Sequence, residues 1–316
     1  MKPYKKIVST AELPYDEWLR YRRMGIGGSD AGAVLGFNKY KGAFVVYQEK
    51  VHGYRDDLSE KESVYWGNVL EPVIIKEFEK KTGKRVHRVN AMLQSVQHPF
   101  MVANLDGKIV NENALLECKT TSAFLDSEWK EDEIPPQYIC QCQHYMAVTG
   151  AERTYIACLI GGQHFIDKTI ERDEEFIEWM IEQEYEFWKA VEDRRPPLAD
   201  GTGATSKFLD TTYQSDGGKV QVPKDIAEAM MVVDLENGRI KALEKSVQEN
   251  KNRIKAFLKG SEVGISERYT AIWKPITTKR ADVQKLKKEY PEIYKECLKE
   301  TTTRKFEIKE REQWQQ

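Results

Sequence analysis

Residues 115–120 read LLECKT, and this short stretch decides how the middle of the chain folds. A β-strand turns successive side chains to opposite faces, so Glu117 and Lys119 share one face and Cys118 lies on the other. A buried carboxylate beside a buried ammonium is unfavourable unless the two groups pair or bind something. The stretch therefore predicts either a structural ion pair or one half of a metal site.

The composition is that of a globular protein. The chain has 316 residues, of which 40% are hydrophobic and 32% charged, with a net charge of −2 at pH 7. This balance argues against a protein that binds nucleic acid through bulk charge alone. No apolar run reaches the roughly 18 residues of a membrane span, and the basic N-terminus lacks the apolar segment of a signal peptide. We therefore expect a cytoplasmic protein with no membrane contact.

Five cysteines are scattered along the chain without a Cys-x-x-Cys pair. This spacing predicts free thiols in a reducing compartment. It also argues against an iron–sulfur cluster, which needs four clustered ligands.

The order of hydrophobic patterns predicts an α/β domain with a central mixed β-sheet flanked by helices. Residues 108–110 and 114–120 are joined by the short polar stretch NEN, which predicts a β-hairpin. Two more strands are expected at 153–160 and 163–170. The predicted helices are 14–24, 43–52, 62–82, one that opens at Pro135, and 172–192.

Three regions follow from composition. Residues 1–198 form the expected core domain, and residues 199–221, rich in Gly, Thr, Ser and Asp, form the expected linker. Residues 222–316 predict a long helix over about 223–258 and a small β-α-β module. Apolar residues in this helix recur every seven positions, but Glu236 and Asn250 interrupt the seam, so both a coiled coil and a helix lying on the last module stay open.

The chemistry centres on Asp106 in NLDG and on the Glu-x-Lys triplet one hairpin later. If the hairpin brings Asp106 beside Glu117, the two carboxylates form an oxygen site suited to Mg²⁺ or Mn²⁺. Lys119 would then orient or deprotonate an attacking water and offset phosphate charge, which outlines a phosphodiester hydrolase. The alternative is that a lone Glu-x-Lys triplet arises by chance.

Two helical residues extend this hypothesis. Glu71 lies at the edge of the apolar stripe of helix 62–82, and a third carboxylate would permit a second metal ion. Gln141 shares a helix face with Gln137 and Tyr145, where it could hold the water or a phosphate oxygen. Each is also explained as an ordinary polar residue at the edge of a packed face.

The glycine-rich turn RRMGIGGSD, residues 22–30, predicts an anion site. It lacks the Gly-Lys-Ser/Thr of a Walker loop, but backbone amides at a helix start attract phosphate, and Ser29 adds a hydroxyl. Arg23 would clamp the same phosphate with two hydrogen bonds. The alternative is a tight turn with a serine cap.

Together these motifs resemble the YqaJ-type viral recombinase nucleases, related to phage lambda exonuclease in the restriction-endonuclease-like Asp…(Asp/Glu)-x-Lys superfamily. The resemblance covers about residues 10–195, with the motifs in the family's order. They are R-x-G-I…S from Arg23 to Ser29, W-G-x-x-x-E from Trp66 to Glu71, D-G at Asp106, E-x-K at Glu117, and Q-x-Q-x-x-M-x-V-T from Gln141 to Thr149.

The resemblance implies a restriction-endonuclease-like core and a Mg²⁺-dependent enzyme in which Mn²⁺ substitutes. Asp106 and Glu117 would bind the catalytic ion, and Glu71 would hold or tune a second one. Lys119 would activate the water, with Gln141 supporting the lysine or the water.

The resemblance also implies a substrate and partners. Arg23 and Ser29 would match the pocket for the 5′-phosphate of a double-stranded DNA end. Digestion from 5′ to 3′ would leave a 3′ single strand for an annealing recombinase, in a bacterial host carrying the phage or prophage. The lambda relative is a trimer, and the resemblance alone implies the same oligomeric state for this chain. An endonuclease or repair nuclease of the same fold, and a non-catalytic DNA-end-binding protein, stay as alternatives.

Overall fold

A computed structural model describes residues 2–54 and 62–309, and the chain divides into two compact units, Met1–Thr212 and Tyr213–Gln316. The elements of unit 1 are β1 Tyr4–Ser9, α1 Tyr15–Arg22, β2 Ile26–Gly27, α2 Gly28–Val34, α3 Ala43–His52, α4 Glu62–Thr82, β3 Val86–His87, β4 Ala91–Ser95, β5 Met101–Asn104, β6 Gly107–Ile109, β7 Ala114–Thr121, the 3-10 helix η1 Ala123–Trp129, α5 Pro136–Thr149, β8 Arg153–Ile160, β9 His164–Glu171, α6 Glu174–Glu192 and α7 Gly203–Thr212.

A five-stranded mixed sheet forms the centre of unit 1. Its strand order is β3-β6-β7-β8-β9, with β7 and β8 parallel and the other neighbours antiparallel. The parallel pair is joined through α5, since parallel neighbours need a crossover. The predicted hairpin is confirmed, because Gly107 of β6 lies opposite Leu116 of β7.

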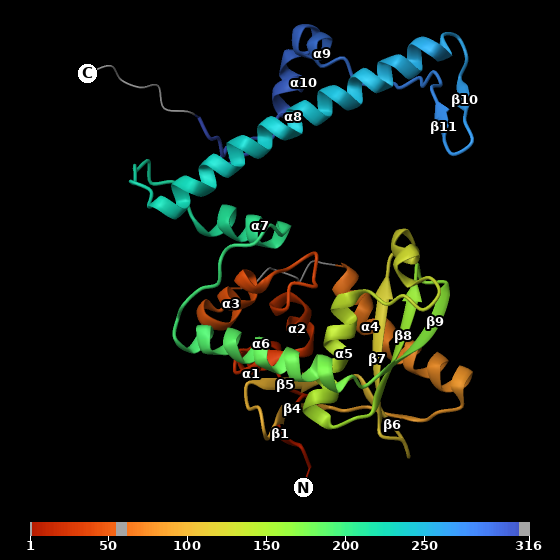
Figure 1. Cartoon of the computed structure of the whole chain (residues 1–316), viewed down its shortest axis with the longest axis vertical. Coiled ribbons are helices and arrows are strands. Elements are labelled where there is room, and N and C mark those ends of the chain that lie inside the picture. Colours follow the sequence, from red (N-terminus) through yellow and green to blue (C-terminus); the bar gives the residue numbers. More distant parts are fainter. Residues whose placement is uncertain (1, 55–61, 310–316) are drawn as a thin grey trace. The chain divides into compact units, whose positions relative to one another are not determined.

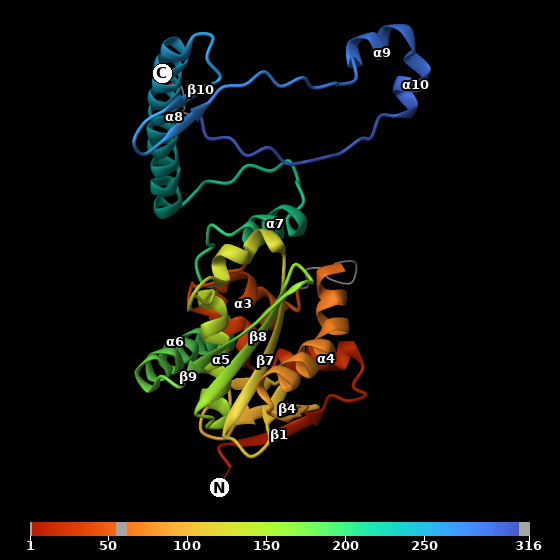
Figure 2. The same ribbon diagram turned by 90° about the vertical axis from the view of Figure 1, so that its right-hand side faces the viewer.

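Helices cover both faces of this sheet, α4 on one side and α5 on the other. Figure 1 shows the elements of the unit, and Figure 2, turned by 90°, shows α4 and α5 on opposite sides of β7 and β8. The alternation in β7 assigns its residues to these layers. Leu116 packs in the cluster that holds Ile74 and Phe78 of α4, and Leu115 packs in the cluster that holds Cys142 of α5. A strand buried on both faces reads as a nearly continuous apolar run. Because residues two apart in a strand share a face, Glu117 faces the α5 layer together with Leu115.

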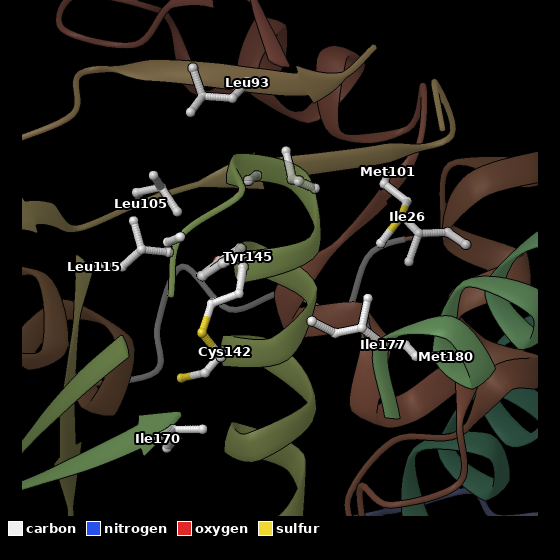
Figure 3. Close-up of a cluster of buried hydrophobic side chains, with 14 of the residues drawn as sticks. Ile26, Leu93, Met101, Leu105, Leu115, Cys142, Tyr145, Ile170, Ile177 and Met180 are labelled. Carbon is white, nitrogen blue, oxygen red and sulfur yellow. The ribbon is translucent and has the colours of Figure 1, made fainter. Parts of the chain in front are cut away.

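A second sheet has the order β1-β4-β5-β2 and packs against the far side of α5. Figure 3 shows Tyr145 and Cys142 of α5 between two sets of side chains, with Leu115 on one side and Met101 and Ile177 on the other. The sequence patterns missed β1, β2 and β4. The strand β2 has two residues and pairs in parallel with β5, so it has no local pattern of its own.

The predicted linker needs a correction, because part of it is ordered in unit 1. Helix α7 packs Phe208 against Phe44 of α3. The carboxylate of Asp200 accepts hydrogen bonds from the backbone N–H of Thr202 and the hydroxyl of Thr205, both at 2.9 Å. It lies so close to Gly42, at the start of α3, that a Cβ there would be 2.0 Å from Asp200 Oδ2. Asp and Thr residues, which are typical of linkers, here form hydrogen bonds at the start of α7 and hold this helix in place.

Unit 2 contains α8 Lys224–Leu258, β10 Val263–Ile265, β11 Thr270–Ile272, α9 Val283–Glu289 and α10 Pro291–Glu296. The long helix agrees with the prediction, but the β-α-β module is wrong. The strands form a hairpin with each other, and residues 299–309 contain no strand; residue 310 lies outside the described part. Pro291 divides the predicted single helix in two, because proline starts a helix readily but is poorly tolerated inside one. Within the described residues, none of the helices could span a bilayer.

Candidate active site

The Glu-x-Lys pair of β7 forms a closed polar cluster with α5. Lys119 Nζ donates to Glu117 Oε1 at 2.6 Å and to Gln141 Oε1 at 3.0 Å. Gln141 Nε2 donates to the same Glu117 Oε1 at 2.6 Å. Glu117 is 3% exposed, and the ammonium of Lys119 also lies 4.9 Å from the ring centre of Tyr138. The ion pair, one of the two alternatives that the sequence left open, is therefore present, held by an amide from the neighbouring helix.

This ion pair leaves one carboxylate oxygen unused. Glu117 Oε2 is buried and has no hydrogen-bond partner within residues 2–54 and 62–309. An unpaired buried acceptor carries a free-energy cost of about 1–3 kcal/mol, more for a charged group. A bound cation would satisfy this oxygen.

Asp106 stands beside this cluster, as the hairpin predicted. Its Oδ2 accepts a hydrogen bond from the backbone N–H of Cys118 at 2.8 Å. Burial and the charge of Glu117 hold the pKa of Asp106 well above its ordinary value. Burial also raises the pKa of Glu117, against the opposing effect of Lys119. Negative charge is thus concentrated in a poorly solvated place, which favours the binding of a cation.

The same carboxylate charges also act on the pKa of Lys119, where they favour the charged form. Burial alone would lower its pKa, but Glu117 and Asp106 outweigh burial and raise it above the ordinary value. The side chain is therefore an ammonium at neutral pH as long as both carboxylates are ionised and not neutralised by another group.

Glu71 lies at the edge of the cluster. Its Oε1 accepts a hydrogen bond from Arg88 at 2.6 Å, yet its charge still contributes to the raised pKa of both Asp106 and Glu117. Across the described residues, no group of three or more His, Cys, Asp and Glu side chains is arranged to hold a metal ion. The structure thus brings together Asp106, Glu117, Lys119 and Gln141, with Glu71 paired elsewhere.

The glycine turn forms a second site, in which Arg22 contacts Ser29. Arg22 Nη2 donates to Ser29 Oγ at 3.0 Å and to both carboxylate oxygens of Asp30 at 2.8 Å. Arg23 is exposed and lines the same cavity. The prediction from the sequence overlooked Asp30. This residue is fully buried, and its carboxylate draws in the side chain of Arg22.

Cations dominate this second site. Asp30 also accepts from Lys50 at 2.8 Å and Lys41 at 3.4 Å. Burial acts to raise the pKa of Asp30, but Arg22 and, after it, Lys50 and Lys41 hold this pKa well below its ordinary value. The adjoining cavity has a volume of about 270 Å³ and an aromatic wall. Its lining residues are Tyr15, Trp18, Leu19, Arg22, Arg23, Ser29, Lys41, Glu49, Lys50, Gly53 and Tyr54. Such a pocket suits a phosphate attached to a flat or apolar group.

Tyr145 connects the two sites, and no role was predicted for it from the sequence. Gln141 Nε2 donates to the Tyr145 hydroxyl at 3.2 Å. The ring lies against Gly28 at the start of α2, where a Cβ would be 2.4 Å from it. Any side chain at position 28 would push the anion site away from α5. The spacing of Gln141 and Tyr145 was visible in the sequence, but their partner Gly28 was not.

His144 anchors the opposite side of α5. Its Nδ1 lies 2.8 Å from Glu184 Oε1 of α6 and its Nε2 lies 3.0 Å from the carbonyl oxygen of Val102, all inside the core. Burial opposes protonation, but Glu184 and these hydrogen bonds raise the pKa of His144 above its ordinary value. The helix that carries Gln141 is thereby held on both of its sides.

The chain is similar to known proteins. A family model of the YqaJ-like viral recombinase domain matches residues 17–152. The chain is 40% identical over 309 residues to the uncharacterized protein YqaJ of Bacillus subtilis (strain 168), covering 96% of this chain and 97% of that protein. A 58-residue stretch is 36% identical to protein D345L of African swine fever virus (strain Badajoz 1971 Vero-adapted), covering 18% of this chain and 16% of that protein.

A solved structure shows the same fold. The alkaline exonuclease LHK-Exo of Laribacter hongkongensis, in complex with dAMP, matches with a TM-score of 0.50 at 21% identity. The match covers 57% of this chain and 94% of LHK-Exo. The restriction-endonuclease-like class expected from the sequence, a mixed sheet flanked by helices, is confirmed.

Proposed function

The chain belongs to the YqaJ-like viral recombinase family, and on this premise we propose that it is a Mg²⁺-dependent exonuclease that digests double-stranded DNA from 5′ to 3′. The observation that carries the proposal is the buried Glu117 carboxylate, which has one oxygen in the Lys119–Gln141 cluster and one without a partner. LHK-Exo, which shares the fold, is an exonuclease whose structure was solved with a nucleotide.

The residues present fit a divalent metal ion. Asp106 and the unpaired Oε2 of Glu117 are hard oxygen donors in a buried setting, and Mg²⁺ or Mn²⁺ prefers such ligands. Glu71 would tune the site, or add a ligand after releasing Arg88. A bound ion would neutralise the carboxylates and polarise the phosphodiester group.

Lys119 and Gln141 would handle the attacking water and the phosphate. Lys119 Nζ donates to both Glu117 and Gln141, and the amide of Gln141 donates to the same Glu117 oxygen, which fixes the position of the ammonium. We propose that Lys119 orients the water and balances the charge that develops on the phosphate. When the carboxylate charges are neutralised, the pKa of Lys119 falls, and this makes proton transfer from the water easier.

The polarity of digestion would come from the second site. Arg22 and Ser29 offer a guanidinium and a hydroxyl to an anion, with Lys50 and Lys41 behind them. We propose that this pocket holds the 5′-phosphate of the strand being digested. The product would be a 3′ single strand for an annealing recombinase, in the cytoplasm of a bacterial host. The trimer implied by the resemblance stays a prediction.

The first experiment is a digestion of linear duplex DNA labelled at either end, beside a closed circle. We expect early loss of the 5′ label with Mg²⁺, persistence of the 3′ label and of the circle, and no reaction with EDTA. Cutting of the circle would instead mean an endonuclease on the same cluster. Binding of ends without cutting in Mg²⁺ or Mn²⁺ would mean a non-catalytic end-binding protein.

Matched variants test the cluster itself. We expect Glu117→Gln to lower the digestion rate by at least a thousandfold, because the metal-binding charge is lost. Glu112→Gln is the control: this glutamate also bonds two neighbours, Lys84 and Tyr155, but lies away from the cluster. Near-wild-type digestion by Glu117→Gln, measured on folded protein, would rule out the assignment.

A further inference from the structure

Unit 2 presents an apolar stripe along α8 that no other described part of this unit covers. Leu258 is the one buried residue of the helix, and the β10–β11 hairpin meets it at the C-terminal end, where Gly264 lies against Leu258. The exposed stripe recurs every seven residues, with exposures of 40–52%. It consists of Ile226, Val233, Ile240, Val247 and Ile254.

A 35-residue helix with such a stripe needs a partner. Most of the stability of a protein helix comes from packing its apolar face rather than from helix propensity. A spacing of seven is the period of a coiled-coil seam, and Ile and Val are common at its a positions. Phe257, at a d position, is 86% exposed and would join the same seam.

Charge is divided between the two halves of α8, and this division selects the partner. Residues 224–238 hold four acidic side chains and one lysine, a net charge of −3. Residues 239–258 hold six basic and two acidic side chains, a net charge of +4. A second copy packed in parallel would place like charges together, whereas an antiparallel copy would set each acidic half beside a basic half.

We propose that α8 is the docking surface for a second copy of this chain, packed antiparallel through the seven-residue seam. The seam itself sets the register. Antiparallel a positions face d positions, and pairing Ile240 with Leu243 of the second copy also pairs Ile226 with Phe257. In this register the two helices overlap along nearly their whole length, roughly 52 Å. The two polar positions of the seam, Asn250 and Glu236, then each face a valine: Asn250 faces Val233, and Glu236 faces Val247.

Molecular mass in solution tests the association. We expect the full-length chain to have twice the mass of the Ile240→Glu/Val247→Glu variant in analytical ultracentrifugation. Met231→Glu/Asn252→Glu, at exposed positions on the other side of the helix, is the matched control and should keep the wild-type mass. Equal masses for the wild type and the seam variant would overturn the proposal, whether the stripe is bare or covered by unit 1.

Cross-linking tests the orientation in a Cys297→Ser background, which removes the exposed native thiol. Mixed Val233→Cys and Asn250→Cys chains should form a disulfide-linked pair on mild oxidation. Val233→Cys alone should not, because in this register its two copies lie roughly 26 Å apart along the axis, beyond the reach of a disulfide. Cross-linking of Val233→Cys alone, or no cross-linking of the mixture, would refute the antiparallel arrangement.

Discussion

At the scale of single residues, the two neighbouring arginines 22 and 23 give a sharp test of the anion pocket. Arg22 contacts Ser29 and Asp30, and Arg23 is exposed. We expect Arg22→Gln to slow digestion of 5′-phosphorylated ends by roughly tenfold to a hundredfold, since a hydrogen bond to a charged group contributes about 1.5–3 kcal/mol. Arg23→Gln should change this rate by less than about threefold. The measurement is the initial rate on 5′-phosphorylated and on 5′-hydroxyl duplexes.

The ratio of these two rates separates recognition from folding. Because Lys50 and Lys41 still pair with Asp30, Arg22→Gln should fold, and a general loss of stability would slow both substrates equally. If Arg23→Gln removes the preference for phosphate and Arg22→Gln keeps it, the sequence-based choice of Arg23 is right and our pocket is wrong.

At the scale of elements, α5 holds the two sites at a fixed distance through Tyr145. We expect Tyr145→Phe to lower the digestion rate several-fold, because Gln141 loses about 1 kcal/mol of hydrogen bonding, while the unfolding free energy changes little. Tyr155→Phe is the control, because it also loses one hydrogen bond, to Glu112, far from α5. Equal rates for the two variants would show that Tyr145 serves packing alone.

At the scale of the whole molecule, the end of unit 1 can be located by truncation. All of the proposed site residues precede Thr212, so a chain ending at 212 should fold and digest DNA at nearly the wild-type rate. A chain ending at 198 loses Asp200 and α7, which exposes Phe44 and should cost about 3 kcal/mol of unfolding free energy. Urea unfolding of both proteins measures this difference, and equal stabilities would restore the predicted boundary.

The sequence by itself determined the parts of this protein that rest on local periodicity. The alternation in LLECKT predicts β7 and its polar pair, the short NEN turn predicts the hairpin, and the seven-residue spacing predicts α8. These patterns arise because a strand repeats every two residues and a helix about every 3.6 residues, so neighbours in the chain are enough to show them. The order of the motifs also indicated the family.

Tertiary structure alone decided the features that join distant segments. Two residues of β2 became a strand because β5 lies beside them, and a Thr- and Gly-rich stretch became α7 because α3 offers Phe44. Arg22 contacts Ser29 and Asp30 because Asp30 is buried at that place, and no pattern of neighbours reports burial across layers. The cost of leaving a buried charge without a partner settles such choices, and it exists only once the chain has folded.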